Sequence, residues 1–180
     1  SSVIAIGWYA FDGCTSLKSI VVKEGNSVFD SREGCNAIIE TATNTLIKGC
    51  NSTIIPSNVT AIGDYAFEDC TSLTSLEIPS SVTEIGNSAF EGCSSLTSIV
   101  IPESITKIND YIFKNNEHIK SINIHNEVTT IGNRSFYDMN ALNSVTIGNK
   151  VTYIGDFAFA YDAALTSINI TDLEAWLRIT

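Results

Sequence analysis

The apolar residues of this chain recur in a fixed register. From Phe67 onward a phenylalanine returns every 23 residues, and the apolar positions around it return with it. A repeat of roughly 20–50 residues is typical of a solenoid, in which each unit buries its apolar face only against its neighbours. The pattern therefore predicts an elongated stack of similar turns. The phenylalanines that we expect to form the repeat core are Phe11, Phe67, Phe90, Phe113, Phe136 and Phe159.

Each unit contains a segment with the spacing of a leucine-rich repeat strand, as in Leu96-Thr-Ser-Ile99-Val-Ile101. Its last two apolar residues alternate with polar ones, as a short half-buried strand of a parallel sheet requires. Three of these segments are followed by Pro56, Pro79 or Pro102. Because proline has no N–H, we expect it to end the hydrogen-bonded ladder there.

The residues between the apolar anchors are predicted to face the concave side of the solenoid, where a partner could bind. Serine fills the first of these columns in all six units, from Ser19 to Ser167. A structural alternative is a ladder of hydroxyls that lets the strands stack closely. The candidate binding residues are Ser75, Glu77, Ser98, Val100, Ser121, Asn123, His125, Ser144, Thr146, Ser167 and Asn169.

A second part of each unit ends in glycine, replaced once by Asn109, and then in aspartate or asparagine. Glycine and asparagine tolerate positive φ, so this column predicts a left-handed turn. Aspartate and asparagine are preferred helix N-caps, and each precedes an Ala-Phe-type segment of about two turns. A ladder of calcium ligands is disfavoured by the asparagines at alternate positions. The predicted N-caps are Asp64, Asn87, Asp110, Asn133 and Asp156.

Together these parts predict an α/β repeat solenoid. We expect a right-handed leucine-rich-repeat superhelix with a parallel β-sheet on the concave side and short helices or turns on the convex side. A single array is expected over residues 1–170. Residues 1–7 match residues 80–86, so we expect the chain to be a piece of a longer protein.

Two segments depart from the period. Phe11 and Phe67 are 56 residues apart, and the unit at about 26–58 contains two β-prone segments around a short polar turn, which predicts a β-hairpin in place of the helix. This unit is either a tolerated insertion or a recognition element. Residues 171–180 predict a helix capped by Asp172, with Leu173, Trp176 and Leu177 on one face. That helix is either a terminal cap or the start of a truncated repeat.

The composition narrows the possible partners. A net charge of −10 and a pI of about 4.5 disfavour nucleic acid and anionic membranes. No apolar run is long enough to span a membrane, so we expect no membrane insertion. Cys14, Cys70 and Cys93 share a column with Asn116, Met139 and Asp162, which indicates partly buried thiols rather than metal ligands. Cys35 and Cys50 lie outside this column, and their pairing is left open.

The sequence contains no motif that indicates catalysis. The two histidines, His118 and His125, have no serine or cysteine partner in a nucleophile-like context. We also find no phosphate-binding loop, HExxH or CxxC motif. The sequence predicts a module that is not an enzyme and that needs no cofactor or metal.

The repeat Ile-Gly-[Asp/Asn]-x-Ala-Phe-x-x-Cys-x-Ser-Leu-Thr-Ser-Ile-x-Ile-Pro resembles the BspA-like, treponemal-type leucine-rich repeats of bacterial surface proteins. The resemblance implies an extracellular or cell-surface location and a role in adhesion or host-protein binding. A glycan or mucin ligand and a purely structural spacer are the alternatives. Sugars stack on exposed aromatic rings, and the candidates lie in varied columns, which favours a local platform over a continuous one. They are Trp8, Tyr9, Tyr65, Tyr111, Tyr137, Tyr153 and Tyr161.

Overall fold

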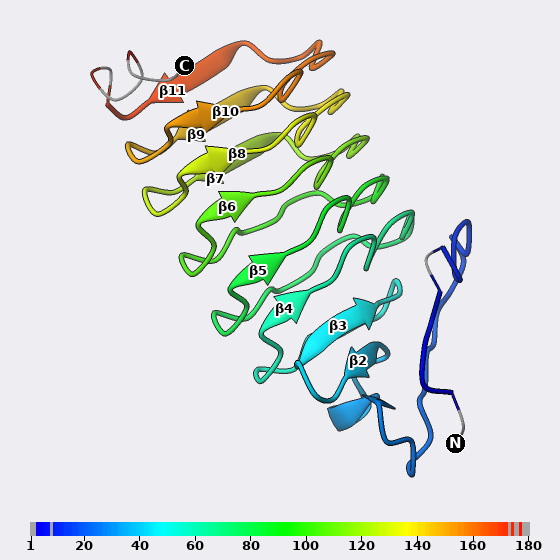
Figure 1. Cartoon of the computed structure of the whole chain (residues 1–180). Helices are drawn as coiled ribbons and strands as arrows, with labels where there is room; N and C mark the ends of the chain where they lie inside the picture. Colours follow the sequence, from blue (N-terminus) through cyan, green and yellow to red (C-terminus); the bar gives the residue numbers. More distant parts are fainter. Residues whose placement is uncertain (1–2, 8, 173, 175–176, 178–180) are drawn as a thin grey trace.

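The chain folds into a solenoid. The computed structural model describes residues 3–7, 9–172, 174 and 177. Successive turns stack as rungs of a curved coil from β3 (Thr45–Lys48) to β11 (Ser167–Ile170), and the N-terminal segment lies along one end of the stack (Figure 1). The predicted solenoid is therefore confirmed.

Two columns of parallel strands run along this coil. One column consists of two-residue strands that precede the glycine of each unit: β4 (Ala61–Ile62), β5 (Glu84–Ile85), β6 (Lys107–Ile108), β8 (Thr130–Ile131) and β10 (Tyr153–Ile154). Strands β4 and β5 pair in parallel, as do β6, β8 and β10. The sequence did not predict this column, because two residues are too few to show an alternating pattern.

The predicted strand column is only partly formed. Its strands are β7 (Ser121–Ile124), β9 (Ser144–Ile147) and β11, which pair in parallel and in register. The equivalent segments at 73–78 and 96–101 have no strand assignment. These two segments precede Pro79 and Pro102, whereas His125, Gly148 and Thr171 follow the three strands.

The sequence analysis expected the prolines only to end strands, but they also prevent the strands before them from forming. The Thr171 N–H donates to the Ile147 carbonyl at 3.1 Å, and proline cannot make this bond. Proline also restricts the backbone of the residue before it. In the described part of the chain, the ladder of this column forms only between units that both lack the proline.

The irregular unit forms an antiparallel hairpin. Strands β2 (Ile38–Glu40) and β3 pair across a short turn, and β1 (Phe29–Asp30) pairs with the other edge of β2. On its free side β3 pairs in parallel with β4, with Leu46 opposite Ile62. The hairpin therefore supplies the first rung of the short-strand column rather than replacing a helix.

Within the described residues, the segments for which the sequence predicted convex-side helices form no helix, so the α/β description is wrong. The segment from Gly63 to Cys70 and its equivalents form consecutive turns. The N–H groups of Ala66, Glu68 and Cys70 donate three residues back, while those of alternate residues donate to the next unit, as from Phe67 to Ala89. Because half of the N–H groups bond between units, an i→i−4 helix cannot form.

The Asp/Asn column is therefore not a set of helix N-caps. The first four of these side chains instead accept a hydrogen bond from the backbone N–H of the equivalent residue in the next unit. The Oδ1 atoms of Asp64, Asn87, Asp110 and Asn133 accept from Asn87, Asp110, Asn133 and Asp156 at 2.7, 3.2, 2.8 and 2.8 Å. The sequence analysis correctly inferred that this column needs a short side chain with an oxygen acceptor. The bond that this oxygen accepts, however, joins residues 23 positions apart in successive units and does not cap a helix.

The glycine column has a different cause from the one predicted. Gly63, Gly86, Gly132 and Gly155 do not have positive φ; the left-handed residues lie two positions later, as at Tyr65 (φ 58°) and Tyr111 (φ 59°). A Cβ on Gly86 would lie 2.4 Å from Asp64 Oδ1 and 2.5 Å from Asp64 N. At Gly86 the preceding unit therefore approaches too closely for a Cβ, whereas Asn109 is accommodated in the same column and its amide donates to the Ile85 carbonyl at 2.6 Å.

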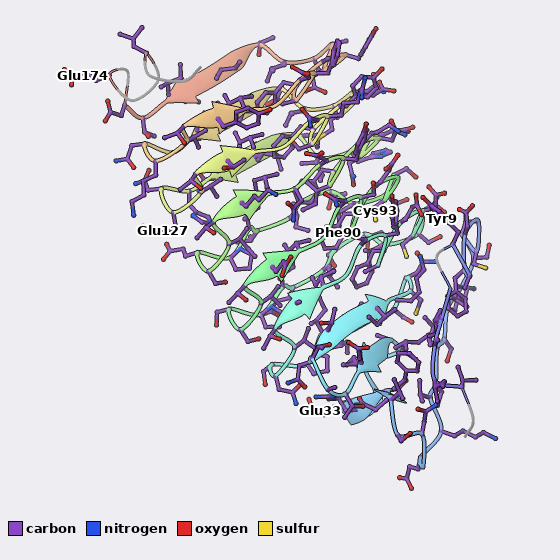
Figure 2. The ribbon with its side chains drawn as sticks, in the orientation of Figure 1. Tyr9, Glu33, Phe90, Cys93, Glu127 and Glu174 are labelled. Atoms are coloured by element: carbon purple, nitrogen blue, oxygen red, sulfur yellow. The ribbon has the colours of Figure 1, made fainter. Side chains whose placement is uncertain are left out.

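The repeat phenylalanines form one stack of rings inside the coil. Phe67, Phe90, Phe113 and Phe136 are fully buried, and Phe159 is half-buried against the core. The four ring pairs from Phe67 to Phe159 have centroids 5.1–5.6 Å apart and interplanar angles of 3–18°. Phe90 can be seen within the stack in Figure 2. Phe11, in the first turn, is half-buried and lies outside this ring stack.

The ends of the chain add little to this core. The predicted C-terminal helix falls largely outside the described residues, including Leu173 and Trp176. The Asp172 carboxylate accepts a hydrogen bond from the Glu174 N–H at 2.9 Å, as an N-cap would. Among the described residues, no helix is both long enough and apolar enough to cross a membrane.

Candidate functional site

The candidate binding residues lie on one solvent-facing strip of the coil. In β7, β9 and β11 the register aligns Ser121 with Ser144 and Ser167, and Asn123 with Thr146 and Asn169. Their side chains are exposed or half-buried, whereas Ile122, Ile124, Val145 and Ile147 point into the core. The strip thus has two columns, one of serine and one of mixed polar residues.

The strip continues onto the two units that lack strands. Ser75, Glu77, Ser98 and Val100 are all exposed, and 79% of Val100 is accessible to solvent. We call the ten residues of these five units the strand strip: Ser75, Glu77, Ser98, Val100, Ser121, Asn123, Ser144, Thr146, Ser167 and Asn169. Within the described chain, no side chain of the strand strip makes a hydrogen bond. The serine column is therefore not a hydrogen-bonded hydroxyl ladder.

Two other polar columns on the coil are used to join successive units. The Asp/Asn column links successive units, as described above. A threonine column does the same: the hydroxyls of Thr83, Thr129 and Thr152 donate to the carbonyls of Thr60, Thr106 and Thr129 at 3.1–3.3 Å. The side-chain donors and acceptors of the strand strip, in contrast, are unused within the described chain.

His125, at the end of the strip, is held in place by two bonds. Its Nδ1 accepts the Glu127 N–H at 3.2 Å, and its Nε2 lies 2.9 Å from the Pro102 carbonyl oxygen. This arrangement assigns the proton of the neutral ring to Nε2, which donates to that carbonyl. His118 is exposed, with Nδ1 2.6 Å from the Ser94 carbonyl oxygen. Both rings connect neighbouring units.

The cysteines are unpaired thiols. Cys35 and Cys50 are buried, and the Cys50 thiol donates to the Asn36 carbonyl at 3.4 Å. Burial raises the pKa of the Cys35 thiol, raises that of Cys70 to about 11, and raises that of Cys93 further. These thiols are therefore protonated at neutral pH and poor nucleophiles. Within the described residues, no three His, Cys, Asp or Glu side chains converge on a metal site.

Aromatic residues other than the repeat phenylalanine gather in the turn segment of every unit except the one around Phe90. The sequence analysis named the tyrosines as candidates for sugar stacking but missed that several of them share a column. Tyr9, Tyr65, Tyr111 and Phe157 share one column, two residues before the repeat phenylalanine, and their backbones all have positive φ. Tyr137 and Tyr161 lie in the same turn segment, with ring centroids 5.0 Å apart. We call these six residues the aromatic edge. The shared offset from the phenylalanine could have revealed the column.

A basic residue completes the C-terminal half of the aromatic edge. The Arg134 guanidinium lies 5.8 Å from the ring centroid of Tyr111 and 5.0 Å from that of Phe157. Its Nη1 also donates to the Tyr111 hydroxyl at 2.9 Å. At these distances the cation is attracted to both ring faces, which links three successive units.

Comparisons with known proteins agree with this architecture. The sequence matches the BspA type leucine rich repeat region in six copies, over residues 1–48 and 40–166. No curated protein matches the sequence.

Three solved structures are similar to the chain. A leucine rich cell surface protein from Faecalibacterium prausnitzii A2-165 is 28% identical, with a TM-score of 0.85 over 95% of this chain and 46% of that one. The pneumococcal vaccine antigen PcpA is 25% identical, with a TM-score of 0.75 over 87% of this chain and 40% of that one. A T. pallidum leucine rich repeat protein is 27% identical, with a TM-score of 0.67 over 72% of this chain and 65% of that one. The chain thus spans less than half the length of the Faecalibacterium protein and of PcpA. Because the repeat match extends over well more than half of the sequence, the chain belongs to the BspA-type leucine-rich repeat family.

Proposed function

We propose that this chain is a non-catalytic module that binds an extracellular protein through the strand strip. Leucine-rich-repeat solenoids typically act as interaction modules, and the family match indicates no catalytic family. The Faecalibacterium protein is described as a cell surface protein, which supports a location at the cell surface or outside the cell for this chain. Adhesion or host-protein binding is the role that we infer.

One observation carries the proposal. The side chains of the strand strip keep their hydrogen-bonding groups free within the described chain, while the Asp/Asn and threonine columns use theirs to join units. A serine hydroxyl and an asparagine amide each offer both donors and acceptors. The strip therefore presents a regular row of unused polar groups, with exposed Val100 as an apolar contact.

The size of the strip sets an expectation for affinity. Five units at about 4.8 Å spacing give a strip on the order of 20–30 Å long. With two side chains per unit its area is on the order of 300–400 Å², well below the roughly 800 Å² per partner of a standard interface. We expect weak binding by one copy and a large gain when many copies act together.

The experiment compares two matched substitutions. Surface plasmon resonance would measure binding of the chain to a panel of immobilised extracellular-matrix proteins. For any protein bound, Asn123→Lys on the strip is expected to weaken binding about tenfold or more, since it places a charge in the contact. Asn149→Lys, which changes an exposed asparagine outside the strip, is expected to leave binding within about twofold. Equal effects of the two substitutions would exclude the strip as the binding face.

The aromatic edge supports a second candidate function, glycan or mucin binding. Tyr9 and Phe157 are each 57% exposed and Tyr161 is 69% exposed, which leaves ring faces open for stacking on sugars. A glycan array would test this role, with loss of the signal expected for Tyr161→Ala. If neither the protein panel nor the array gives binding, the spacer role is favoured instead.

A further inference from the structure

The regular stack of phenylalanine rings has one gap. The rings stack continuously from Phe67 to Phe159, but the irregular unit at 26–58 supplies no equivalent phenylalanine between Phe11 and Phe67. At the end of β3, Gly49 passes so close to the Phe67 ring that a Cβ would lie 2.2 Å from a ring atom. Backbone thus covers Phe67, and among the described residues no equivalent aromatic ring fills the space beside Phe11.

A cavity of about 260 Å³ lies at this gap. The first turn contributes Ile6, Ala10 and Phe11 to its apolar wall, and β3 contributes Ile47. The rings of Tyr9 and Tyr65 lie at its boundary, with centroids 5.2 Å apart. Hydrogen bonds join the first turn to the next unit. The Asn51 amide donates to the Thr15 and Leu17 carbonyls at 3.1 and 3.2 Å. The cavity is therefore bounded by tethered parts of the chain.

The polar part of the lining is negatively charged. It contains the carboxylates of Asp12, Asp64 and Glu68 against the single ammonium of Lys48. The Lys48 ammonium donates to the backbone carbonyls of Tyr65 and Glu68 at 3.2 and 3.4 Å, so it is directed at the backbone. The Glu68 carboxylate makes no hydrogen bond within the described chain.

Glu68 is in an environment that disfavours its charge. Burial raises its pKa to about 6, and the carboxylates of Glu91, Asp69 and Asp12 act in the same direction, while Lys48 opposes them. Above that pH an incoming cation would relieve this repulsion. The apolar wall, the tyrosine rings and the carboxylates together suit a positively charged group on an apolar body.

We propose that this cavity binds a small organic cation: an ammonium group carried on one aromatic ring or a short aliphatic chain. The volume supports this size, because a 150 Å³ apolar cavity is known to hold benzene and drug-sized ligands need roughly 300–1,000 Å³. The apolar body takes the place of the missing phenylalanine beside Phe11, and the ammonium faces Glu68. This site is separate from the strand strip and does not depend on the function proposed for it.

The test uses three probes of nearly equal shape and different charge: 2-phenylethylammonium, 2-phenylethanol and phenylacetate. Titrations of the whole chain followed by two-dimensional NMR would give both the affinity and the residues affected. The cation is expected to bind about fivefold or more tightly than the alcohol, with phenylacetate weakest. Shifts should concentrate at residues 6–12, 47–48 and 64–68. Equal affinities of the three probes, or shifts centred elsewhere, would overturn the proposal.

Two variants locate the charge that matters. Glu68→Gln preserves the shape of the side chain and is expected to weaken binding of 2-phenylethylammonium about fivefold at pH 7.5. Binding to the unsubstituted chain should also weaken between pH 7.5 and pH 5, as Glu68 takes up a proton, and this dependence should be smaller in the variant. Glu117→Gln removes an equal charge at an exposed position outside the cavity and should bind like the original chain. A Glu68→Gln variant that binds as tightly as Glu117→Gln would refute the site.

Discussion

Asp162 occupies a column in which other polar residues donate hydrogen bonds inward. The Cys93 thiol donates to the Phe67 carbonyl at 3.2 Å, and the Asn116 amide donates to the Phe90 carbonyl at 2.8 Å. An ionised aspartate cannot donate. Asp162 accepts the Met139 N–H at 2.8 Å through Oδ1, but its buried Oδ2 has no partner within the described chain. Burial raises its pKa to about 7, the Asp138 carboxylate adds to this effect, and the Met139 bond opposes it.

We predict that Asp162→Asn stabilises the chain at pH 8. The folded pKa is above the unfolded value, so the native state holds a proton that the unfolded state loses between about pH 4 and pH 7. The stability of the original chain therefore falls as the pH rises through this window. Asparagine removes the charge and supplies a donor, as Asn116 does, so a gain on the order of 1–3 kcal/mol is expected in urea unfolding at pH 8.

The gain should shrink as the pH is lowered towards 3, where the original aspartate is protonated in both states. Asp138→Asn serves as a comparison, because it removes the neighbouring charge without supplying the inward donor. A gain from Asp162→Asn that is independent of pH would show that ionisation of Asp162 is not the cause.

At the scale of elements, the position after each predicted strand decides whether a ladder forms. We predict that Pro102→Thr extends the β7–β9–β11 sheet by one strand. The substitution makes the unit at 96–101 free of proline, like its neighbour at 119–124. The new hydrogen bonds are worth about 0.5–1.5 kcal/mol each, which is partly offset by the loss of a rigid proline, about 0.4–1 kcal/mol.

Amide hydrogen exchange is therefore a better measurement than overall stability. Amides between positions 98 and 102 are expected to exchange about tenfold more slowly after the substitution. Pro56→Thr is the matched control, since the unit at 73–78 beside it still ends in Pro79. Protection that is equal in both variants, or absent from both, would contradict the role given to the prolines.

The sequence predicted elements that depend on local pattern and missed those that depend on contact between units. The period, the buried phenylalanines and the hairpin at 38–48 could be read from spacing and turn residues. The helices could not be excluded locally, because Gly-Asx-x-Ala-Phe satisfies the rules for a capped helix. What prevents a helix is a set of bonds between residues 22 or 23 apart, such as Phe67 N–H to the Ala89 carbonyl. The strand strip was placed on one face by its alternation. The tyrosines of the aromatic edge were named as candidates for sugar stacking, but their shared column was overlooked.

For the whole molecule, each unit is stabilised by contact with its two neighbours. Phe113 is fully buried between Phe90 and Phe136, whereas Phe159 is half-buried with one stacked neighbour, Phe136. We predict that Phe113→Ala lowers the free energy of unfolding by about 3–5 kcal/mol, because it leaves a cavity in the interior of the stack. Phe159→Ala should cost about half as much, since the terminal unit can fray alone.

Urea unfolding followed by circular dichroism would measure both variants. The central substitution is expected to broaden the transition or divide it into two, because it weakens the contact between the two halves of the array. The terminal substitution should leave one main transition. If both variants lose equal stability, the ring stack does not couple the units as described.

The alternation of aspartate and asparagine along the bonded column has a consequence for how such an array could lengthen. Two adjacent aspartates would place like charges in neighbouring turns, at a cost of about 1 kcal/mol in water-like surroundings. Here Asp64, Asp110 and Asp156 are each separated by an amide. Tandem duplication of one aspartate-bearing unit would bring two carboxylates together, whereas duplication of an Asp–Asn pair of units would preserve the alternation. Duplication of two units together is therefore electrostatically cheaper than duplication of a single aspartate-bearing unit.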